Sequence, residues 1–127
     1  MIYEEMLEKI KNAYSPYYKF NVCACVVTKK GKYFGVNVEN ANGTSICAER
    51  NAIAAAVCDG NKRGDFEKIY VMLHNGEFGV PCFACRQVIL EFFEKDKKVI
   101  SITTKGEEKE YTVDELCPHA FSMDDLK

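Results

Sequence analysis

The sequence has 127 residues, 47% of them hydrophobic and 28% charged, with a formal net charge of −2 at pH 7. This composition excludes a disordered, collagen-like or low-complexity chain, and the length predicts a single domain over residues 1–127. No apolar run approaches ~20 residues, so we expect no membrane-spanning helix. The charge balance argues against a basic groove for nucleic acid. We see no export signal and therefore expect a cytoplasmic, reducing location, where the seven cysteines are thiols or metal ligands.

The order of hydrophobic patterns along the chain predicts an α/β protein. In chain order we expect a helix over 3–14, strands over 22–28 and 32–38, a polar loop over 40–45, a helix over 47–58, a strand over 68–73, a helix over 82–93, a strand over 99–103, a short strand over 110–113 and a helical turn over 113–117. Lys29-Lys30-Gly31 predicts the hairpin turn between the first two strands. This order predicts a three-layer α-β-α sandwich around a mixed sheet of about five strands.

Three cysteines stand at predicted helix starts. Cys47 begins one helix, and Cys82 and Cys85 begin the next, three residues apart and therefore on one face. A helix N-terminus favours thiolate over thiol because its unpaired N–H groups carry partial positive charge. Three protein ligands with one open position are the pattern of a catalytic zinc site. His74 and His119 lie away from the helix starts, and no fourth ligand is evident.

Two charged residues follow the first cysteine directly. Glu49 stands two residues after Cys47, close enough to accept a proton from an activated water and pass it to a substrate nitrogen without being a ligand. Arg50 comes next, and a guanidinium that donates to thiolate sulfurs would reduce the negative charge of a three-thiolate site. The segment Cys-Ala-Glu-Arg thus offers a metal ligand, a group that transfers protons and a positive charge that offsets the thiolates.

These motifs resemble those of the small, homotetrameric, zinc-dependent cytidine deaminases. The resemblance rests on Cys-Ala-Glu-Arg-Asn-Ala at 47–52 and on Pro-Cys-x-x-Cys-Arg-Gln-Val at 81–88. It extends to Ser-Pro-Tyr and Phe within 15–20, to Gly-Val-Asn-Val-Glu-Asn-Ala at 35–41 and to the C-terminal segment 114–121. The resemblance therefore covers about residues 14 to 121.

The family resemblance implies a fold, an activity and a set of roles. It implies a cytidine-deaminase-like fold, a homotetramer, a Zn²⁺ cofactor and hydrolytic deamination of free cytidine or deoxycytidine to uridine or deoxyuridine in pyrimidine salvage. The implied roles are zinc ligation by Cys47, Cys82 and Cys85, proton transfer by Glu49, thiolate neutralisation by Arg50, base contacts by Phe20 and the N–H of Ala48, binding of the ribose 3′-hydroxyl by Asn37 and Glu39, and a contact from Phe121 to a neighbouring subunit's site.

The chain departs from the family pattern in three places. The loop over 41–46 is one residue short and lacks a tyrosine, Phe83 stands where glycine is usual, and Val80 replaces a serine. Blasticidin S deaminases also shorten the loop, but they lose the glutamate that is retained here as Glu39. A deaminase of such a modified cytosine nucleoside is the alternative activity.

Other interpretations remain for individual residues. Cys82 and Cys85 alone would also fit a thioredoxin-like redox pair, although the Cys-x-Glu motif upstream favours zinc. A nucleic-acid editing deaminase needs a basic groove, and a structural zinc module needs a fourth ligand. Asn37 and Glu39 could be solvated strand residues, and Phe20 and Phe121 could be core. We expect the four remaining cysteines to be small buried hydrophobic residues, namely Cys23, Cys25, Cys58 and Cys117.

Overall fold

A five-stranded mixed sheet forms the centre of the computed structural model, which describes residues 1–127. The strands are β1 (Val22–Thr28), β2 (Gly31–Val36), β3 (Phe66–Leu73), β4 (Lys98–Ile102) and β5 (Glu108–Thr112), in the spatial order β2-β1-β3-β4-β5. The helices are α1 (Ile2–Lys9), α2 (Ala48–Cys58), α3 (Phe83–Phe92) and α4 (Val113–Leu116), with 3₁₀ turns η1 (Ile10–Asn12) and η2 (Met123–Leu126). Only β3 and β4 pair in parallel. The predicted α/β sandwich and mixed sheet are confirmed.

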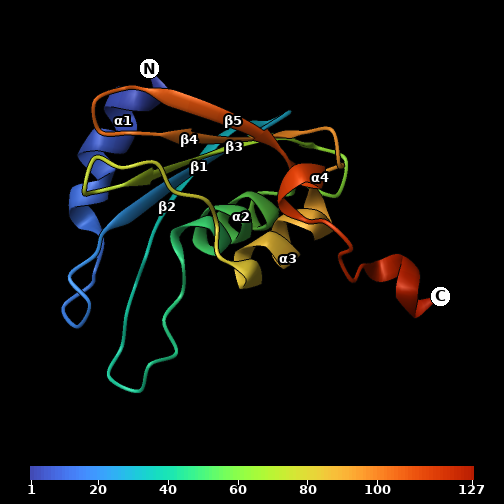
Figure 1. The fold of residues 1–127 in the computed structure, drawn as a ribbon, viewed down its shortest axis with the longest axis horizontal. Coiled ribbons are helices and arrows are strands. Elements are labelled where there is room, and N and C mark those ends of the chain that lie inside the picture. The colour runs from blue at the N-terminus through green and yellow to red at the C-terminus, as the bar shows by residue number, and fades with distance from the viewer.

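Helices cover both faces of the sheet (Figure 1). On one face, α1 buries Met6 and η1 buries Ile10, four residues apart, against a cluster that includes Cys23 and Cys25. The expected helix over 3–14 ends earlier, because the chain tightens into η1 and then leaves the helix at Ala13. This layer explains why β1 carries small thiols on its α1 side.

The opposite face of the sheet packs against α2 and α3 (Figure 1). Ala24 and Val26 of β1 and Ile69 and Val71 of β3 point to this side, and all four are buried. Since β1 is covered on both faces, its sequence is an almost continuous run of small apolar residues and does not alternate between apolar and polar residues. The helix α3 connects the parallel strands β3 and β4.

A glycine allows α2 to lie directly on β2. A Cβ atom on Gly35 would stand 2.4 Å from the backbone nitrogen of Ala52 and 2.5 Å from the carbonyl oxygen of Ala48. The side chain of Asn51 adds a hydrogen bond of 2.7 Å from Nδ2 to the carbonyl of Val36. The contacts fix where α2 begins, and that start carries the predicted site residues.

The structure corrects the sequence expectations at several boundaries. The second strand ends at Val36 instead of residue 38, and Val38 instead forms isolated bridges to Tyr14 and Ile46. Cys58 is exposed at the end of α2, so the expectation that it is buried was wrong, and Cys117 is only partly buried. The turn η2 was not expected; beyond α4 the chain runs away from the sheet towards it (Figure 1). No helix combines the length and apolar character needed to cross a membrane.

Candidate active site

Three thiols converge where α2 and α3 begin. The sulfur atoms of Cys47, Cys82 and Cys85 all lie within 4.8 Å of one another, and no other such group of cysteine, histidine or acidic side chains occurs. Cys47 Sγ lies 3.9 Å from Cys82 Sγ, which lies 3.5 Å from Cys85 Sγ. Tetrahedral zinc with Zn–S bonds near 2.3 Å separates its sulfur ligands by about 3.8 Å. The donor set and its spacing therefore fit a zinc ion with one open position.

Two of these cysteines occupy helix N-caps. Cys47 caps α2 and Cys82 caps α3 with extended backbone angles, and neither side chain makes a capping hydrogen bond. Burial raises the pKa of the Cys82 thiol, but hydrogen bonds with Cys85 and Cys47 outweigh it, so the net pKa lies below its ordinary value. The sulfurs are thus presented to a shared point at two positively polarised helix ends.

Arg50 lies against the thiol cluster. Its Nη2 lies 3.5 Å from Cys47 Sγ and 3.4 Å from the carbonyl oxygen of Ser45. Interactions with Cys47 and then with Cys85 raise the pKa of this guanidinium. The buried Nε has no hydrogen-bond partner. A partly buried positive group that faces the sulfurs without a carboxylate partner fits a cluster of thiolates.

Glu49 is buried beside the same cluster. Its side chain is 5% exposed, and it forms no ion pair with a lysine or arginine. Burial raises the pKa of this carboxyl, although a hydrogen bond from its own backbone N–H and the charge of Arg50 oppose the shift. A carboxyl group in such surroundings can carry a proton at neutral pH more readily than an exposed one.

A cavity of about 360 Å³ opens in front of Cys47, Cys82 and Glu49. This volume lies near the lower end of the range for small-molecule sites. Of the predicted substrate contacts, four line the cavity, namely Phe20, Asn37, Glu39 and Ala48. Segments far apart in sequence therefore meet at one cavity, whose lining is mostly hydrophobic.

The cavity also contains residues that sequence reasoning did not assign. Tyr18 stands at its mouth, Val71 and Leu73 form part of its wall from β3, and Ile46 comes from the short loop. The alternating pattern of β3 could have indicated which of its residues face α2. It could not have indicated that the side chains at the end of this strand line the cavity. Val80, one of the three departures from the family pattern, also lines the cavity.

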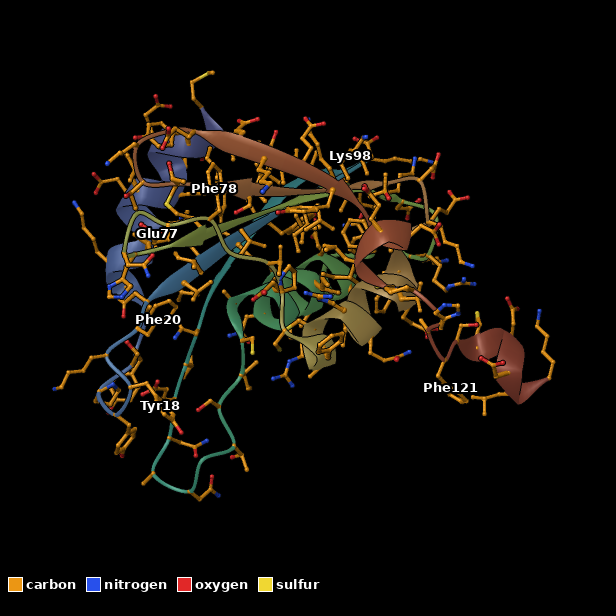
Figure 2. All side chains as sticks on the ribbon, viewed as in Figure 1. Tyr18, Phe20, Glu77, Phe78, Lys98 and Phe121 are labelled. Atoms are coloured by element: carbon orange, nitrogen blue, oxygen red, sulfur yellow. The ribbon has the colours of Figure 1, made fainter.

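Phe121 does not reach the cavity of its own chain. Figure 2 shows it on the C-terminal segment, across the molecule from Tyr18 and Phe20. Its carbonyl accepts a hydrogen bond of 2.7 Å from Gln87 Nε2, and its side chain is 58% exposed. Within one chain, Phe121 does not line the cavity formed by the other predicted substrate contacts.

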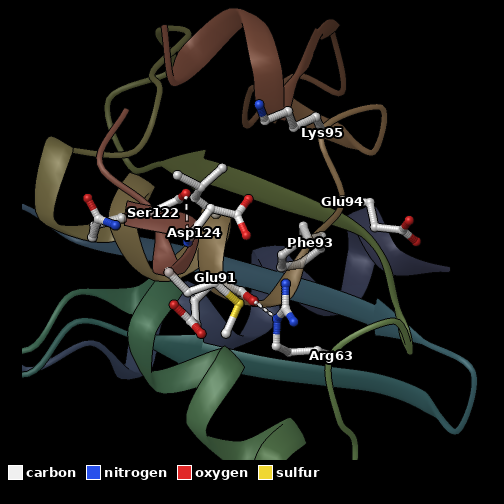
Figure 3. Close-up of a pocket in the computed structure, with 10 residues that line it drawn as sticks. Arg63, Glu91, Phe93, Glu94, Lys95, Ser122 and Asp124 are labelled. Carbon is white, nitrogen blue, oxygen red and sulfur yellow. Dashed lines mark hydrogen bonds between the residues drawn. The ribbon is translucent and has the colours of Figure 1, made fainter. Parts of the chain in front are cut away.

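A second cavity, of about 260 Å³, lies between the end of α3 and η2 (Figure 3). Arg63 and Lys95 share its wall with Glu91, Glu94 and Asp124. Arg63 Nε donates to the carbonyl of Glu91 at 2.7 Å. The wall thus mixes both signs of charge and contains none of the thiol cluster, so the chemistry concentrates in the first cavity.

The arrangement at the first cavity defines a class of enzyme. Zinc deaminases that act on a cytosine or adenine amino group combine three cysteine or histidine ligands with a glutamate that is not a ligand. The chain belongs to the family described as the cytidine and deoxycytidylate deaminase zinc-binding region, whose model matches residues 1–103.

Individual relatives agree with this family. A cytidine deaminase of Halalkalibacterium halodurans is 38% identical over 128 residues, which cover 99% of this chain and 96% of that protein. A cytidine deaminase of Sporosarcina psychrophila is 42% identical over 118 residues, covering 91% and 85%. The crystal structure of cytidine deaminase from Burkholderia pseudomallei superposes with a TM-score of 0.86 at 35% identity, covering 93% and 94%. The family resemblance inferred from the sequence motifs is confirmed.

Proposed function

We propose that this protein removes the amino group of free cytidine or deoxycytidine by hydrolysis, giving uridine or deoxyuridine and ammonia, as a step of pyrimidine salvage. The observation that carries the proposal is the convergence of three thiols and a buried glutamate on one nucleoside-sized cavity. Relatives named cytidine deaminase over nearly the whole chain support the choice of substrate.

Cys47, Cys82 and Cys85 would hold the zinc ion, and Arg50 would offset the charge of their thiolates. Zinc held in this way supplies the Lewis acidity that makes water a nucleophile near neutral pH. Glu49 takes one proton of the attacking water and delivers it to the ring nitrogen N3 as the oxygen bonds to C4. It then moves the remaining proton of the new C4 hydroxyl to the amine, so that the C4–N bond breaks, the C4 carbonyl forms and ammonia leaves. One water is consumed and one ammonia leaves for each nucleoside.

The chain's own residues would orient the base. The N–H of Ala48 is the first of α2, has no acceptor within the helix and lies at the cavity, so it is free to donate to the base carbonyl O2. The ring of Phe20 packs against the pyrimidine, and the carbonyl of Val80 accepts from the exocyclic amine. Asn37 and Glu39 line the same cavity and would bind the ribose 3′-hydroxyl.

We further propose a homotetramer in which Phe121 of one copy completes the site of another. Its exposure and its distance from the cavity of its own chain support this role. Sedimentation would test it, because a fully active monomer is incompatible with a shared site.

A substrate panel read by ammonia release tests the proposed activity. With the zinc-loaded protein we expect kcat/KM for cytidine and deoxycytidine to exceed that for blasticidin S. We expect no turnover of cytosine within an oligonucleotide. Faster release from the antibiotic than from cytidine would overturn the assignment. Cys58→Ala changes an exposed thiol outside the cluster and should release ammonia from each substrate at the wild-type rate.

A further inference from the structure

An exposed loop supplies part of the cavity wall. Residues 13–21, which we call the aromatic loop, connect η1 to β1 and contribute Tyr18 and Phe20 to the cavity. The side chain of Tyr18 is 81% exposed and that of Phe20 is 37% exposed, and both project from the loop in Figure 2. Apart from the edge contact of the Phe20 ring with His74, at 4.8 Å between ring centroids, burial of apolar surface does little to hold this loop, so hydrogen bonds supply most of its restraint.

Besides bonds within the loop and to Ile10 and His74, the loop is held by the segment that follows β2. Tyr14 N donates to Asn37 O at 3.0 Å, and Glu39 N donates to Tyr14 O at 2.8 Å. The side chain of Asn37 donates from Nδ2 to Phe20 O at 2.8 Å and accepts from Val22 N at Oδ1, also at 2.8 Å. Both ends of the aromatic loop are thus fastened to residues 37–39.

Glu39 fastens the middle of the loop. Its side chain is 6% exposed and makes no ion pair, but Oε1 accepts from Tyr17 N at 2.9 Å and from Tyr18 N at 3.2 Å. A buried carboxylate requires such donors, and hydrogen bonds to a charged acceptor are stronger than neutral ones. Oε2 has no protein partner, and the residue lines the cavity.

We infer that Glu39 is a positioning residue that holds the aromatic loop, and with it the Phe20 wall, through the backbone N–H groups of Tyr17 and Tyr18. This role is separate from any contact with the sugar, although its kinetic consequence rests on the proposed deamination of cytidine. If Glu39 acted on the 3′-hydroxyl alone, its loss would be harmless for a nucleoside that lacks this group. A displaced Phe20 wall instead misplaces the base of every substrate.

The kinetic test compares cytidine with 3′-deoxycytidine. Glu39→Ala should lower kcat/KM by about 10-fold or more on both substrates, and Glu39→Gln, which keeps an oxygen acceptor for the loop, should restore part of the 3′-deoxycytidine turnover. A loss confined to cytidine would overturn the inference. Glu110→Ala, an exposed glutamate on β5, is the control and should behave as wild type.

Amide hydrogen exchange tests the inference independently of activity. In the wild-type protein the Tyr17 and Tyr18 amides should exchange at least ~10²-fold more slowly than exposed amides. Glu39→Gln should keep most of this protection and Glu39→Ala should lose it. Unprotected amides in the wild type, or unchanged protection in Glu39→Ala, would refute the role of Glu39. Failure of the wild type to deaminate cytidine would refute the proposed function instead.

Discussion

Replacing Gly35 by alanine should disturb both stability and the site. The added Cβ would lie 2.4 Å from Ala52 N and 2.5 Å from Ala48 O, where ordinary contacts begin at 3.4 Å. Both atoms belong to the α2 backbone, so relief requires α2 to move by about 1 Å away from β2. Overpacking costs about 1–3 kcal/mol, and we expect about 3 kcal/mol here because no side chain can rotate aside.

The same displacement should lower activity, because the start of α2 carries Cys47 and Glu49. A misplacement of about 1 Å can cost about 10²-fold in rate. Urea unfolding measures the stability change and ammonia release from cytidine measures the rate. Gly64→Ala is the control for the clash: its Cβ meets nothing within 4 Å, so its φ of +93° should cost some stability through backbone strain while the rate stays that of wild type. Gly35→Ala that is as stable and as active as this control would refute the reasoning.

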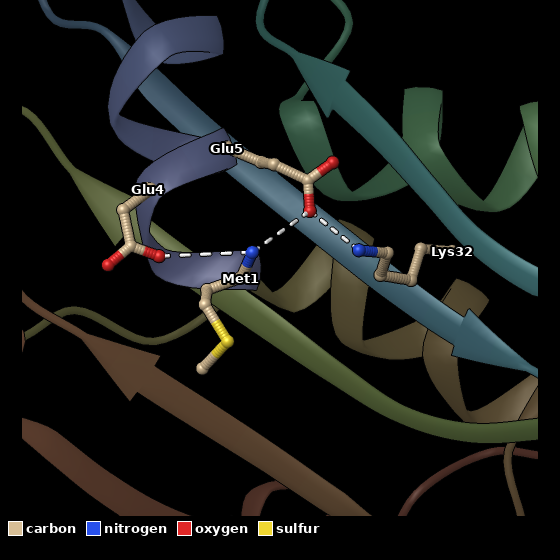
Figure 4. A network of polar contacts seen from close by, with 4 residues as sticks. All are labelled: Met1, Glu4, Glu5 and Lys32. Atoms are coloured by element: carbon tan, nitrogen blue, oxygen red, sulfur yellow. Dashed lines mark hydrogen bonds and ion pairs between the residues drawn. The ribbon is translucent and has the colours of Figure 1, made fainter.

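Three further predictions follow from named contacts. Cys82→Ala should reduce bound zinc from one per chain to near zero and lower the unfolding temperature, because the site joins α2 to α3; full zinc content in metal analysis would contradict the ligand assignment. Arg50→Gln should lower kcat by about 10–100-fold, the usual effect of a group that tunes a metal site, and unchanged kcat would exclude that role. Lys32 Nζ lies 2.6 Å from Glu5 Oε1 and links β2 to α1 (Figure 4). This hydrogen bond lowers the pKa of Glu5 and raises that of Lys32. The stabilisation should therefore be complete between the ordinary values of 4.5 and 10.5, and should fade as the pH falls through the lowered pKa of Glu5 or rises through the raised pKa of Lys32. Thermal unfolding of Lys32→Met against wild type should differ most inside that range, and a difference that persists at acid pH would contradict the pairing.

Local sequence patterns predicted most of the elements, because each is encoded by nearby residues. The alternation of cysteine with Ala24 and Val26 in β1 reflects two covered faces. The early end of the first helix was missed because the competing partner of Tyr14 is Asn37 O, which is distant in sequence. Cys58 was taken as buried from its residue type alone, although its position at the end of α2 leaves it exposed.

The thiol cluster was predictable from the sequence, but the contacts that support the site were not. The helix-start cysteines, Glu49 and Arg50 follow from spacing and from the chemistry of zinc. The hydrogen bonds of Glu39 join residues 21 and 22 positions apart, and no local pattern encodes them. The cavity wall from β3 is likewise set by strand order, which short-range periodicity does not determine.

Proton transfer by Glu49 beside a three-cysteine zinc site is the central claim. The most direct measurement is ammonia release from cytidine by wild-type and Glu49→Gln proteins of equal, measured zinc content. Since Glu49 lines the cavity without belonging to the thiol cluster, the variant should keep its zinc and its fold. We expect kcat to fall by about 10²–10⁴-fold in Glu49→Gln. A zinc-loaded Glu49→Gln protein that turns over cytidine within a few-fold of wild type would contradict it.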